Sequence, residues 1–536
     1  MGTLYCNGTI ITMKDSALYA EAVYVKDGRI EAVGTMEEVM KQKKDADEVI
    51  DLKGHTMLPG FIDGHSHFVG AANAMTQCDL SSCGNYEEIV KKMKQFAQKR
   101  NLPSNAWIVG CNYDQNFLDE KRHPDRYVLD AISDTNPVLL IHASSHMGVT
   151  NSRGLEVQKI DEHTEDCAGG KYGRVNGCRI PNGYMEEKAF LSFQAELPLP
   201  SMEELMHLIK EAQDMYASYG VTTVQDGMVA KPVFQLLKYA SGIGLLKLDV
   251  VGYADIMTAW DIMEEEPAYA NRYTEHFKMG GYKIFLDGSP QGKTAWMTQP
   301  YEGEDTYCGY PIHTDEDLKQ YIELALDKKQ QLLAHCNGDA AAEQYISQFE
   351  NVLAHRKEKE LYRAVMVHAQ LVRKDQLQRM AAIGMMPSFF VAHAYFWGDI
   401  HLKNFGAERG SQISPVRSAI DYGMKYTFHQ DTPVILPDML RTVWSAVNRV
   451  SRMGKVIGEN QRISVLEALK AITSYGAYQY FEENEKGTIE CKKYADFVIL
   501  DRNPLETPKE ELADIKVLCT IKENQVIYRN EEYQHE

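Results

Sequence analysis

The chain has 536 residues, of which 44% are hydrophobic and 25% charged, and a formal net charge of −19 at pH 7. This composition is typical of a globular protein with a large buried core, and the length predicts two or more domains. The negative charge argues against nucleic acid or an anionic membrane as a partner, because both are themselves negatively charged.

The ten cysteines are scattered without a CxxC pair, which favours reduced thiols over a disulfide framework. The amino terminus has no basic segment followed by a long apolar run. No apolar stretch approaches the roughly 20 residues that a membrane span requires. We therefore expect a soluble, cytoplasmic protein.

Both ends of the chain have the pattern of short strands joined by tight turns. Residues 1–56 combine β-branched residues with NG, DG and KG turn signals, and residues 482–536 repeat this pattern. The two ends predict one small β-sandwich domain completed by both termini. Two unrelated hairpins that cap the main domain are the alternative.

Residues 57–481 alternate apolar strand-like runs with amphipathic helical segments, which is typical of βα units around a parallel sheet. Eight strands are expected, at residues 57–65, 221–227, 246–253, 282–288, 331–338, 364–370, 385–393 and 425–431. They predict an α/β fold, a (β/α)8 barrel of the TIM type. After the first strand we expect an insertion, at about residues 70–219, that is partly helical and is loop-rich from Trp107 to Glu187.

Histidines and charged residues recur where the expected barrel strands end. In PGFIDGHSHF, His65 and His67 are two residues apart and point to the same face of an extended chain. Barrels of this type carry their active sites at the carboxyl ends of the strands. Such a pair is weak evidence alone, but later strands add Lys283, His335, His368 and Asp431. The whole set predicts a centre for Zn²⁺ or a similar divalent cation.

Each member also has a simpler interpretation. His335 or His368, taken singly, fits a buried histidine that is satisfied by its neighbours. Lys283 fits a salt bridge to Asp287, because an unpaired buried ammonium is costly. Alternatively, a neutral Lys283 takes up carbon dioxide and becomes a carbamate that bridges two metal ions, since burial lowers the pKa of lysine.

These motifs resemble the amidohydrolase superfamily, and within it the YtcJ-like branch that includes N-substituted formamide deformylases. The resemblance covers nearly the whole chain through LPGFIDGHSHF, GVTTVQDG, KIFLDGSPQGKTA, LLAHCNGDAA, VHAQ, DTPV and KGTIECKKYADFVILD. It implies a barrel with one or two divalent ions, a small-molecule substrate and, from the habit of the family, a homodimer. By position it implies that His65, His67 and Asp431 hold one ion, that His335 and His368 hold the other, and that Lys283 bridges them.

The insertion also resembles the substrate side of that branch. His146, Asn151, Gly183 and Glu187 stand at matching positions. The family's GSD is His429-Gln430-Asp431 here, Lys293 replaces an arginine, and Ser144 replaces an aspartate. These departures leave the metal ligands intact and put the substrate in doubt, since His429 shares a face with Asp431.

The predicted reaction is hydrolysis of a C–N bond in an amide, N-formyl compound or cyclic amide by a metal-activated hydroxide. Asp431 is expected to act as the base, and the alternative is that it is a metal ligand only. Aromatic residues after the fourth and seventh strands indicate an apolar substrate or simply packed loops. The candidate substrate contacts are His146, Glu187, Asp287, His429, Phe390 and Trp397. A deaminase, an ester or lactone hydrolase and an inactive binding barrel are the alternatives. The deaminases carry a glutamate where this chain has Gly338.

Overall fold

A computed structural model describes residues 2–42, 48–115, 117–142, 147–167, 170–176, 178–198, 200–357, 360, 362–531 and 533. The chain divides into two compact units. We call Met1–Ala71 together with Ile209–Glu536 the barrel unit, and Ala72–Leu208 the inserted unit. No helix in the described ranges is long and apolar enough to cross a membrane.

Eight parallel strands form one sheet in the barrel unit, in the order β21-β20-β19-β18-β17-β16-β15-β8. In chain order they are β8 (Phe61–Ile62), β15 (Val221–Val229), β16 (Asp249–Asp255), β17 (Phe277–Phe285), β18 (Gln331–Cys336), β19 (Val365–His368), β20 (Met386–Phe389) and β21 (Thr427–Phe428). The last strand returns to the first, because the amide of Gly64 donates to the carbonyl oxygen of Phe428 at 3.1 Å. The sheet thus closes into the predicted TIM-type barrel.

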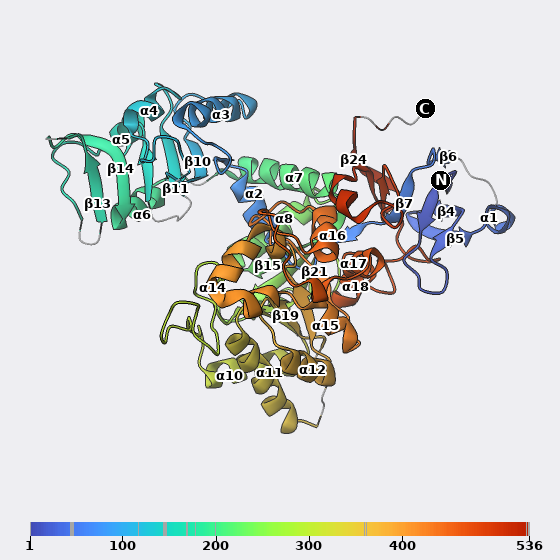
Figure 1. The fold of residues 1–536 in the computed structure, drawn as a ribbon. Coiled ribbons are helices and arrows are strands. Elements are labelled where there is room, and N and C mark those ends of the chain that lie inside the picture. The colour runs from blue at the N-terminus through green and yellow to red at the C-terminus, as the bar shows by residue number, and fades with distance from the viewer. Residues whose placement is uncertain are drawn as a thin grey trace. The chain divides into compact units, whose positions relative to one another are not determined.

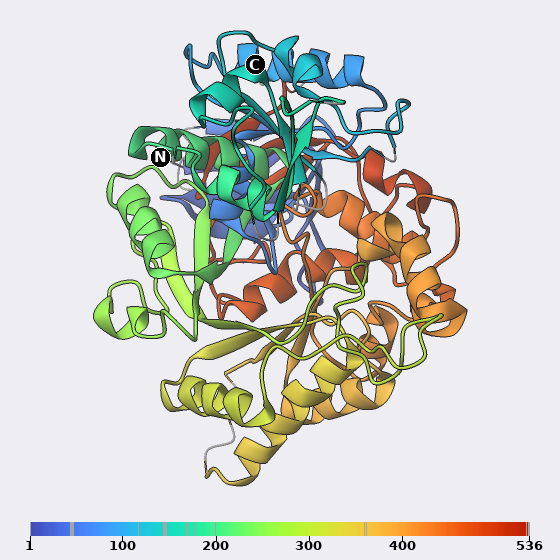
Figure 2. The ribbon, with the colours of Figure 1, turned by 90° about the vertical axis from the view of Figure 1, so that its left-hand side faces the viewer.

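Apolar side chains fill the inside of the barrel, and helices cover its outside. Buried interior residues include Ile62, Val251, Leu333 and Val367, so the barrel is a packed core and not a pore. The covering helices include α8 (Lys231–Gly242), α10 (Asp315–Asp327), α11 (Asp339–Ala354), α12 (Lys374–Ile383) and α16 (Met439–Asn448). Figure 2 shows the yellow and orange helices of this set on the outer side of the strands.

The predicted strand 57–65 is two strands in different sheets. β7 (Thr56–Pro59) pairs with β2 (Thr9–Ile11) and β22 (Phe497–Leu500), whereas β8 belongs to the barrel. Gly60 separates them at a close approach, since a Cβ at that position would lie 2.4 Å from Cγ2 of Thr222. The apolar run 57–65 looks like one strand in the sequence, although its two halves belong to different sheets.

Both termini build the predicted β-sandwich. One sheet has the order β5-β4-β1-β6 and the other β24-β23-β22-β7-β2-β3. The remaining strands are β1 (Gly2–Cys6), β3 (Tyr19–Ala20), β4 (Ala22–Lys26), β5 (Arg29–Gly34), β6 (Glu48–Asp51), β23 (Val517–Lys522) and β24 (Gln525–Arg529). Residues from both sheets, such as Val23, Val25, Phe497 and Ile521, share one buried cluster. Figure 1 shows the blue amino-terminal strands beside the red carboxy-terminal ones.

The inserted unit has a six-stranded sheet of its own, in the order β13-β14-β12-β11-β10-β9. Its strands are β9 (Gln77–Asp79), β10 (Ile108–Tyr113), β11 (Val138–His142), β12 (Met147–Thr150), β13 (Gly170–Arg174) and β14 (Pro181–Glu187). Between these strands lie α3 (Tyr86–Lys99), α4 (Arg126–Asp130) and α5 (Ser152–Val157), and α6 (Lys188–Ala195) follows β14. The segment from Trp107 to Glu187, expected to be loop-rich, contains β10 to β14 and two short helices between its loops. Strands such as KYGR and PNGYMEE are too short and polar to show the alternation that marks a strand.

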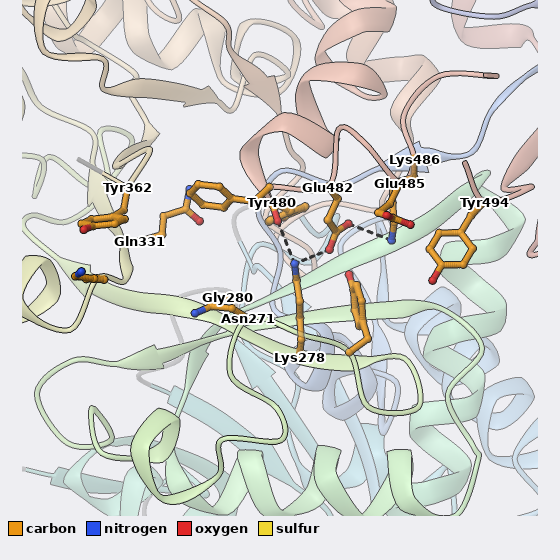
Figure 3. Close-up of a pocket in the computed structure, with 13 residues that line it drawn as sticks. Asn271, Lys278, Gly280, Gln331, Tyr362, Tyr480, Glu482, Glu485, Lys486 and Tyr494 are labelled. Atoms are coloured by element: carbon orange, nitrogen blue, oxygen red, sulfur yellow. Dashed lines mark hydrogen bonds and ion pairs between the residues drawn. The ribbon is translucent and has the colours of Figure 1, made fainter. Parts of the chain in front are cut away.

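A network of buried charges closes the amino-terminal end of the barrel (Figure 3). Glu482 pairs with Nζ of Lys278 at 2.6 Å and with Nζ of Lys486 at 3.0 Å. Lys278 also donates to the carbonyl oxygen of Tyr480 at 3.0 Å. These residues line a cavity of about 390 Å³ at the strand ends opposite the predicted metal centre. Because its charges compensate one another, we assign the cavity a structural role.

Candidate metal centre

The structure brings all six predicted metal-site residues together at the carboxyl ends of the barrel strands. His65 and His67 follow β8, Lys283 lies in β17, and His335 lies in β18. The other two are His368, which ends β19, and Asp431, which follows β21.

The tightest group consists of His65, His67 and Asp431, whose candidate ligand atoms lie within 4.8 Å of one another. Oδ1 of Asp431 is 3.4 Å from Nε2 of His65 and 3.2 Å from Nε2 of His67. Tetrahedral donors about 2.1 Å from a zinc ion are separated from one another by roughly 3.4 Å, so the spacing suits one shared cation. No hydrogen bond from the described residues satisfies this buried oxygen.

Gln225 determines which nitrogen of His65 faces the group. The Gln225 amide nitrogen donates to the carbonyl oxygen of Gly64 at 3.1 Å and to the hydroxyl of Tyr480 at 3.0 Å. Its amide oxygen therefore faces Nδ1 of His65, at 2.5 Å. Because an amide oxygen only accepts, Nδ1 must carry the proton. Nε2 is therefore unprotonated and lies beside Asp431, and an unprotonated imidazole nitrogen is the form of histidine that binds a metal ion.

His335 and His368 form a second pair of facing nitrogens. Nδ1 of His335 lies 3.0 Å from Nε2 of His368. Nε2 of His335 is 3.2 Å from the carbonyl oxygen of Gly288 and 3.0 Å from the side-chain nitrogen of Asn337, and a proton on Nε2 pairs it with the carbonyl. The lone pair of Nδ1 then points at His368, an arrangement that a cation between the two rings would stabilise.

His429 orients His368. Its Nε2 lies 3.1 Å from Nδ1 of His368, and its Nδ1 lies 2.9 Å from the hydroxyl of Ser388. His429 is fully buried and both ring nitrogens have partners. The structure thus places it behind His368 as a positioning residue, and its contact with a substrate stays a prediction.

Lys283 is buried next to the first group. Its Nζ lies 3.2 Å from Nε2 of His65 and 4.9 Å from the centre of the Phe285 ring. Burial lowers the pKa of Lys283 to about 7, although Asp431 opposes this shift. A large fraction of the amine is therefore neutral near pH 7, which is the state that reacts with carbon dioxide.

Asp287 does not pair with Lys283 in the described part of the chain. Its carboxylate accepts backbone N–H groups of Trp296 at 3.0 Å, Asn337 at 2.9 Å and Gly338 at 2.7 Å. Burial raises its pKa to about 7. Through these hydrogen bonds Asp287 stabilises the loops that flank His335. Its contact with a substrate stays a prediction.

The electrostatics of the centre suit a cation. Burial lowers the pKa of His335 to about 4 and holds the pKa values of His65 and His368 well below their usual range, so these rings are neutral. Burial raises the pKa of Asp431, but His67, whose Nε2 lies 3.2 Å from Oδ1, together with His368 and His65 holds it well below its usual range, so the carboxylate is ionised. Neutral imidazoles around a carboxylate are the donor set that zinc prefers.

Backbone strain is concentrated at the same place. His368 (φ 71°), Ala369 (φ 44°) and Asp431 (φ 54°) lie in the left-handed region, which favours glycine. Such conformations cost about 1–3 kcal/mol each and cluster at functional sites, where the fold forces side chains into position. Here they turn two predicted ligands toward the axis of the barrel.

The other predicted substrate contacts are Phe390, Trp397, His146 and Glu187. Phe390 and Trp397 pack together, with ring centres 5.8 Å apart, and Phe390 is 5.3 Å from the His429 ring. His146 lies outside the described residues. Glu187 is exposed at the end of β14 in the inserted unit. Two further matched positions there, Asn151 and Gly183, are structural.

Asn151 begins α5 by accepting the amide of Gly154 at 2.8 Å. Gly183 has a φ of 93°, and a Cβ there would lie 2.2 Å from the carbonyl oxygen of Thr150.

The sequence did not predict the residues that orient the proposed metal ligands through hydrogen bonds. Gln225 lies inside GVTTVQDG, and Ser388 in the seventh strand, where neither residue type signals a metal site. A buried histidine pair, His393 and His401, was missed as well. His393 comes at the end of the predicted strand 385–393, the same signal that identified His335 and His368.

A closed parallel barrel that gathers histidines and a carboxylate at the carboxyl ends of its strands defines the class of metal-dependent barrel hydrolases. The chain belongs to the amidohydrolase family, whose model matches residues 48–528. This membership confirms the superfamily predicted from the motifs.

Individual relatives agree with the predicted branch. The chain is 27% identical over 529 residues to the N-substituted formamide deformylase of Arthrobacter pascens, with 96% of each chain covered. It is also 27% identical to the putative amidohydrolase YtcJ of Bacillus subtilis, over 98% of this chain and 99% of that one. Its fold is similar to that of an uncharacterized metal-dependent hydrolase from Pyrococcus horikoshii, with a TM-score of 0.77, 24% identity, and coverage of 95% and 99% of the two chains.

Proposed function

We propose that the protein hydrolyses a C–N bond of a small N-formyl, N-acyl or cyclic amide at a zinc centre. His65, His67 and Asp431 would hold one ion, and His335 and His368 would hold a second. Lys283, as a carbamate, would add ligand oxygens to the centre. The observation that carries this proposal is the fixed tautomer of His65, whose unprotonated Nε2 lies 3.4 Å from an oxygen of Asp431 that has no hydrogen-bond partner among the described residues.

Divalent ions held by these residues would supply Lewis-acid chemistry to water and to a carbonyl group. Asp431 takes the proton of the attacking water and delivers it to the leaving nitrogen. Its ionised state and its position beside His65 and His67 suit both steps. Gln225 and His429 keep the imidazoles in one orientation during the reaction.

An amide substrate is supported by the relatives and by the surroundings of the centre. A chain that is 27% identical over nearly its full length is named N-substituted formamide deformylase. A region of 227 residues is 38% identical to an imidazolonepropionase from a Geobacillus strain. Phe390 and Trp397 form an apolar surrounding next to His429, which suits a hydrophobic group on the substrate.

The surroundings of Gly338 support amide hydrolysis over the deaminase alternative. The glutamate of those enzymes would stand at Gly338, where a Cβ would lie 1.8 Å from the carbonyl oxygen of Trp296. The Gly338 amide also donates to Asp287. A glutamate at this position would require the backbone of both loops to move.

Metal analysis coupled to a substrate panel tests the proposal. The panel contains N-formyl amines, N-acyl amines, cyclic amides, the matching esters and aminated heterocycles. We expect close to two zinc ions per chain and turnover of amides. Turnover of esters or aminated heterocycles alone would contradict the proposed reaction, and protein that binds no metal in zinc-supplemented buffer would indicate an inactive barrel.

Lys283→Ala tests the bridging role. The variant should lose bound metal and most activity, and short carboxylic acids should restore part of both by replacing the carbamate. Lys210→Ala, which removes an exposed lysine of a surface pair, is the matched control and should behave as the wild type. Full metal content and full rate in Lys283→Ala would show that the bridge does not exist.

A further inference from the structure

A second buried histidine pair lies outside the proposed metal ligands. His393 begins α13 (His393–Phe396), and His401 lies in α14 (Gly398–Ser411). Nδ1 of His393 is 3.0 Å from Nε2 of His401, and the two rings are stacked with an interplanar angle of 7°. Both side chains are buried, with 3% and 0% of their surface exposed. This pair has no part in the mechanism above.

The surroundings of His401 determine where the protons lie. Burial lowers the pKa of His401 to about 3, so the ring is neutral and carries one N–H. Its Nδ1 is buried without a hydrogen-bond partner in the described residues. An unpaired buried N–H is rarer than an unpaired acceptor, so the proton belongs on Nε2. Nε2 then donates to Nδ1 of His393, which forces the proton of His393 onto its own Nε2.

His393 therefore presents a donor, and it does so among aromatic rings beside the metal centre. Its ring centre is 4.4 Å from that of Phe390 and 4.5 Å from that of Trp397. Phe390 in turn is 6.2 Å from the His368 ring. Within the described part of the chain, no hydrogen bond engages Nε2 of His393. One polar N–H in an aromatic surrounding is typical of a site that recognises a planar ligand with a single acceptor.

We propose that His393 recognises the substrate, donating its Nε2–H to an acceptor on a planar apolar group that lies against Phe390 and Trp397. His401 is a positioning residue that fixes the tautomer of His393. The inference rests on the proposed amide hydrolysis and narrows its substrate to compounds with an aromatic group that carries a ring nitrogen or similar acceptor.

Neutron diffraction from deuterated crystals of the metal-loaded protein tests the tautomer directly, whatever the substrate. We expect deuterium on Nε2 of both His393 and His401. Deuterium on Nδ1 of His393 would overturn the proposal, because Nε2 would then be an acceptor.

A matched set of formamides tests the recognition. Phenethyl formamide is compared with its three pyridyl isomers, in which one ring CH is replaced by nitrogen. The wild type should favour at least one isomer about three- to tenfold in kcat/KM, the worth of one neutral hydrogen bond. His393→Phe should remove this preference, so that the favoured isomer and phenethyl formamide are hydrolysed with similar kcat/KM.

Two further variants complete the test. His393→Gln should restore part of the preference, because a glutamine amide nitrogen reaches the place of Nε2. His163→Phe, at an exposed histidine of the inserted unit, should keep the wild-type preference. A preference that persists in His393→Phe, or a wild type that favours none of the isomers, would overturn the proposal.

The experiments distinguish failure of the proposed amide hydrolysis from failure of the proposed role of His393. If none of the formamides is hydrolysed, calorimetric titration of the metal-loaded protein with the same compounds measures the preference as a ratio of Kd values. The same comparison of wild type and His393→Phe then decides the recognition. If the formamides are hydrolysed without any dependence on His393, the proposed function stands and only this inference fails.

Discussion

Replacing Gln225 by leucine should weaken metal binding without unfolding the barrel. The side chain makes three hydrogen bonds, to His65, Gly64 and Tyr480. Two of these partners keep another bond, since Gly64 still accepts from Gln479 at 2.7 Å and Tyr480 still donates to the carbonyl oxygen of Asp63. Only Nδ1 of His65 is left unpaired.

The expected losses of stability and of zinc affinity follow from this count of hydrogen bonds. One unpaired buried donor costs about 1–3 kcal/mol of folding free energy. The metal ion loses a ligand that was fixed in the binding tautomer, and loss of such a supporting bond typically lowers metal affinity about 10- to 100-fold. Chelator competition measures the Kd for zinc, and urea denaturation of the metal-free protein measures the free energy of unfolding.

Gln461→Leu is the matched control. Gln461 is also buried and holds Ser418 through two hydrogen bonds, so its loss should lower stability by a comparable amount. It contacts none of the proposed ligands, and its zinc affinity should equal that of the wild type. The reasoning is refuted if Gln225→Leu binds zinc within about threefold of the wild type, or if Gln461→Leu weakens binding as strongly.

Two other substitutions test the base and the closed end of the barrel. Asp431→Asn should lower kcat by about 100-fold or more, as expected for loss of a general base, and near-wild-type turnover in a steady-state assay would exclude this role. Glu482→Gln should lower the free energy of unfolding by about 3–5 kcal/mol in urea titrations, since Lys278 and Lys486 would lose a buried partner, whereas the exposed Glu37→Gln should cost less than about 1 kcal/mol. Burial raises the pKa of Glu482, but Lys278 and Lys486 hold it below its usual value, so its stabilisation is present at neutral pH and is lost as the pH falls through the acid range. An equal deficit at neutral and strongly acidic pH would contradict this assignment.

The fold was predictable where strands and helices are long and strongly periodic. The eight barrel strands and α10 follow from apolar runs and from the capping box formed by Thr314 and Asp317. The strand break at Gly60 and the sheet of the inserted unit did not follow. Gly60 marks a contact with Thr222, more than 150 residues away in sequence, and the inserted strands depend on pairing partners that no local pattern reveals.

The site was predictable to the extent that metal chemistry restricts residue types. His65, His67, His335, His368 and Asp431 are the residues that a metal centre requires at strand ends, and the structure gathers them. The residues that orient these ligands could not be predicted in this way. A glutamine or a serine has many roles in a protein core, and only the geometry shows that Gln225 and Ser388 lie behind ligands.

Tyr480 connects the two ends of the barrel and shows why the last part of the chain belongs to the metal centre. Its carbonyl oxygen accepts Lys278 in the charge network at the amino-terminal end. Its hydroxyl accepts from Gln225, which fixes the tautomer of His65. The neighbouring residue Gln479 donates to Gly64 and accepts from Thr427 at 2.6 Å, so it joins the first and last strands of the barrel. The segment after β21 therefore closes the sheet and orients the first proposed ligand at the same time.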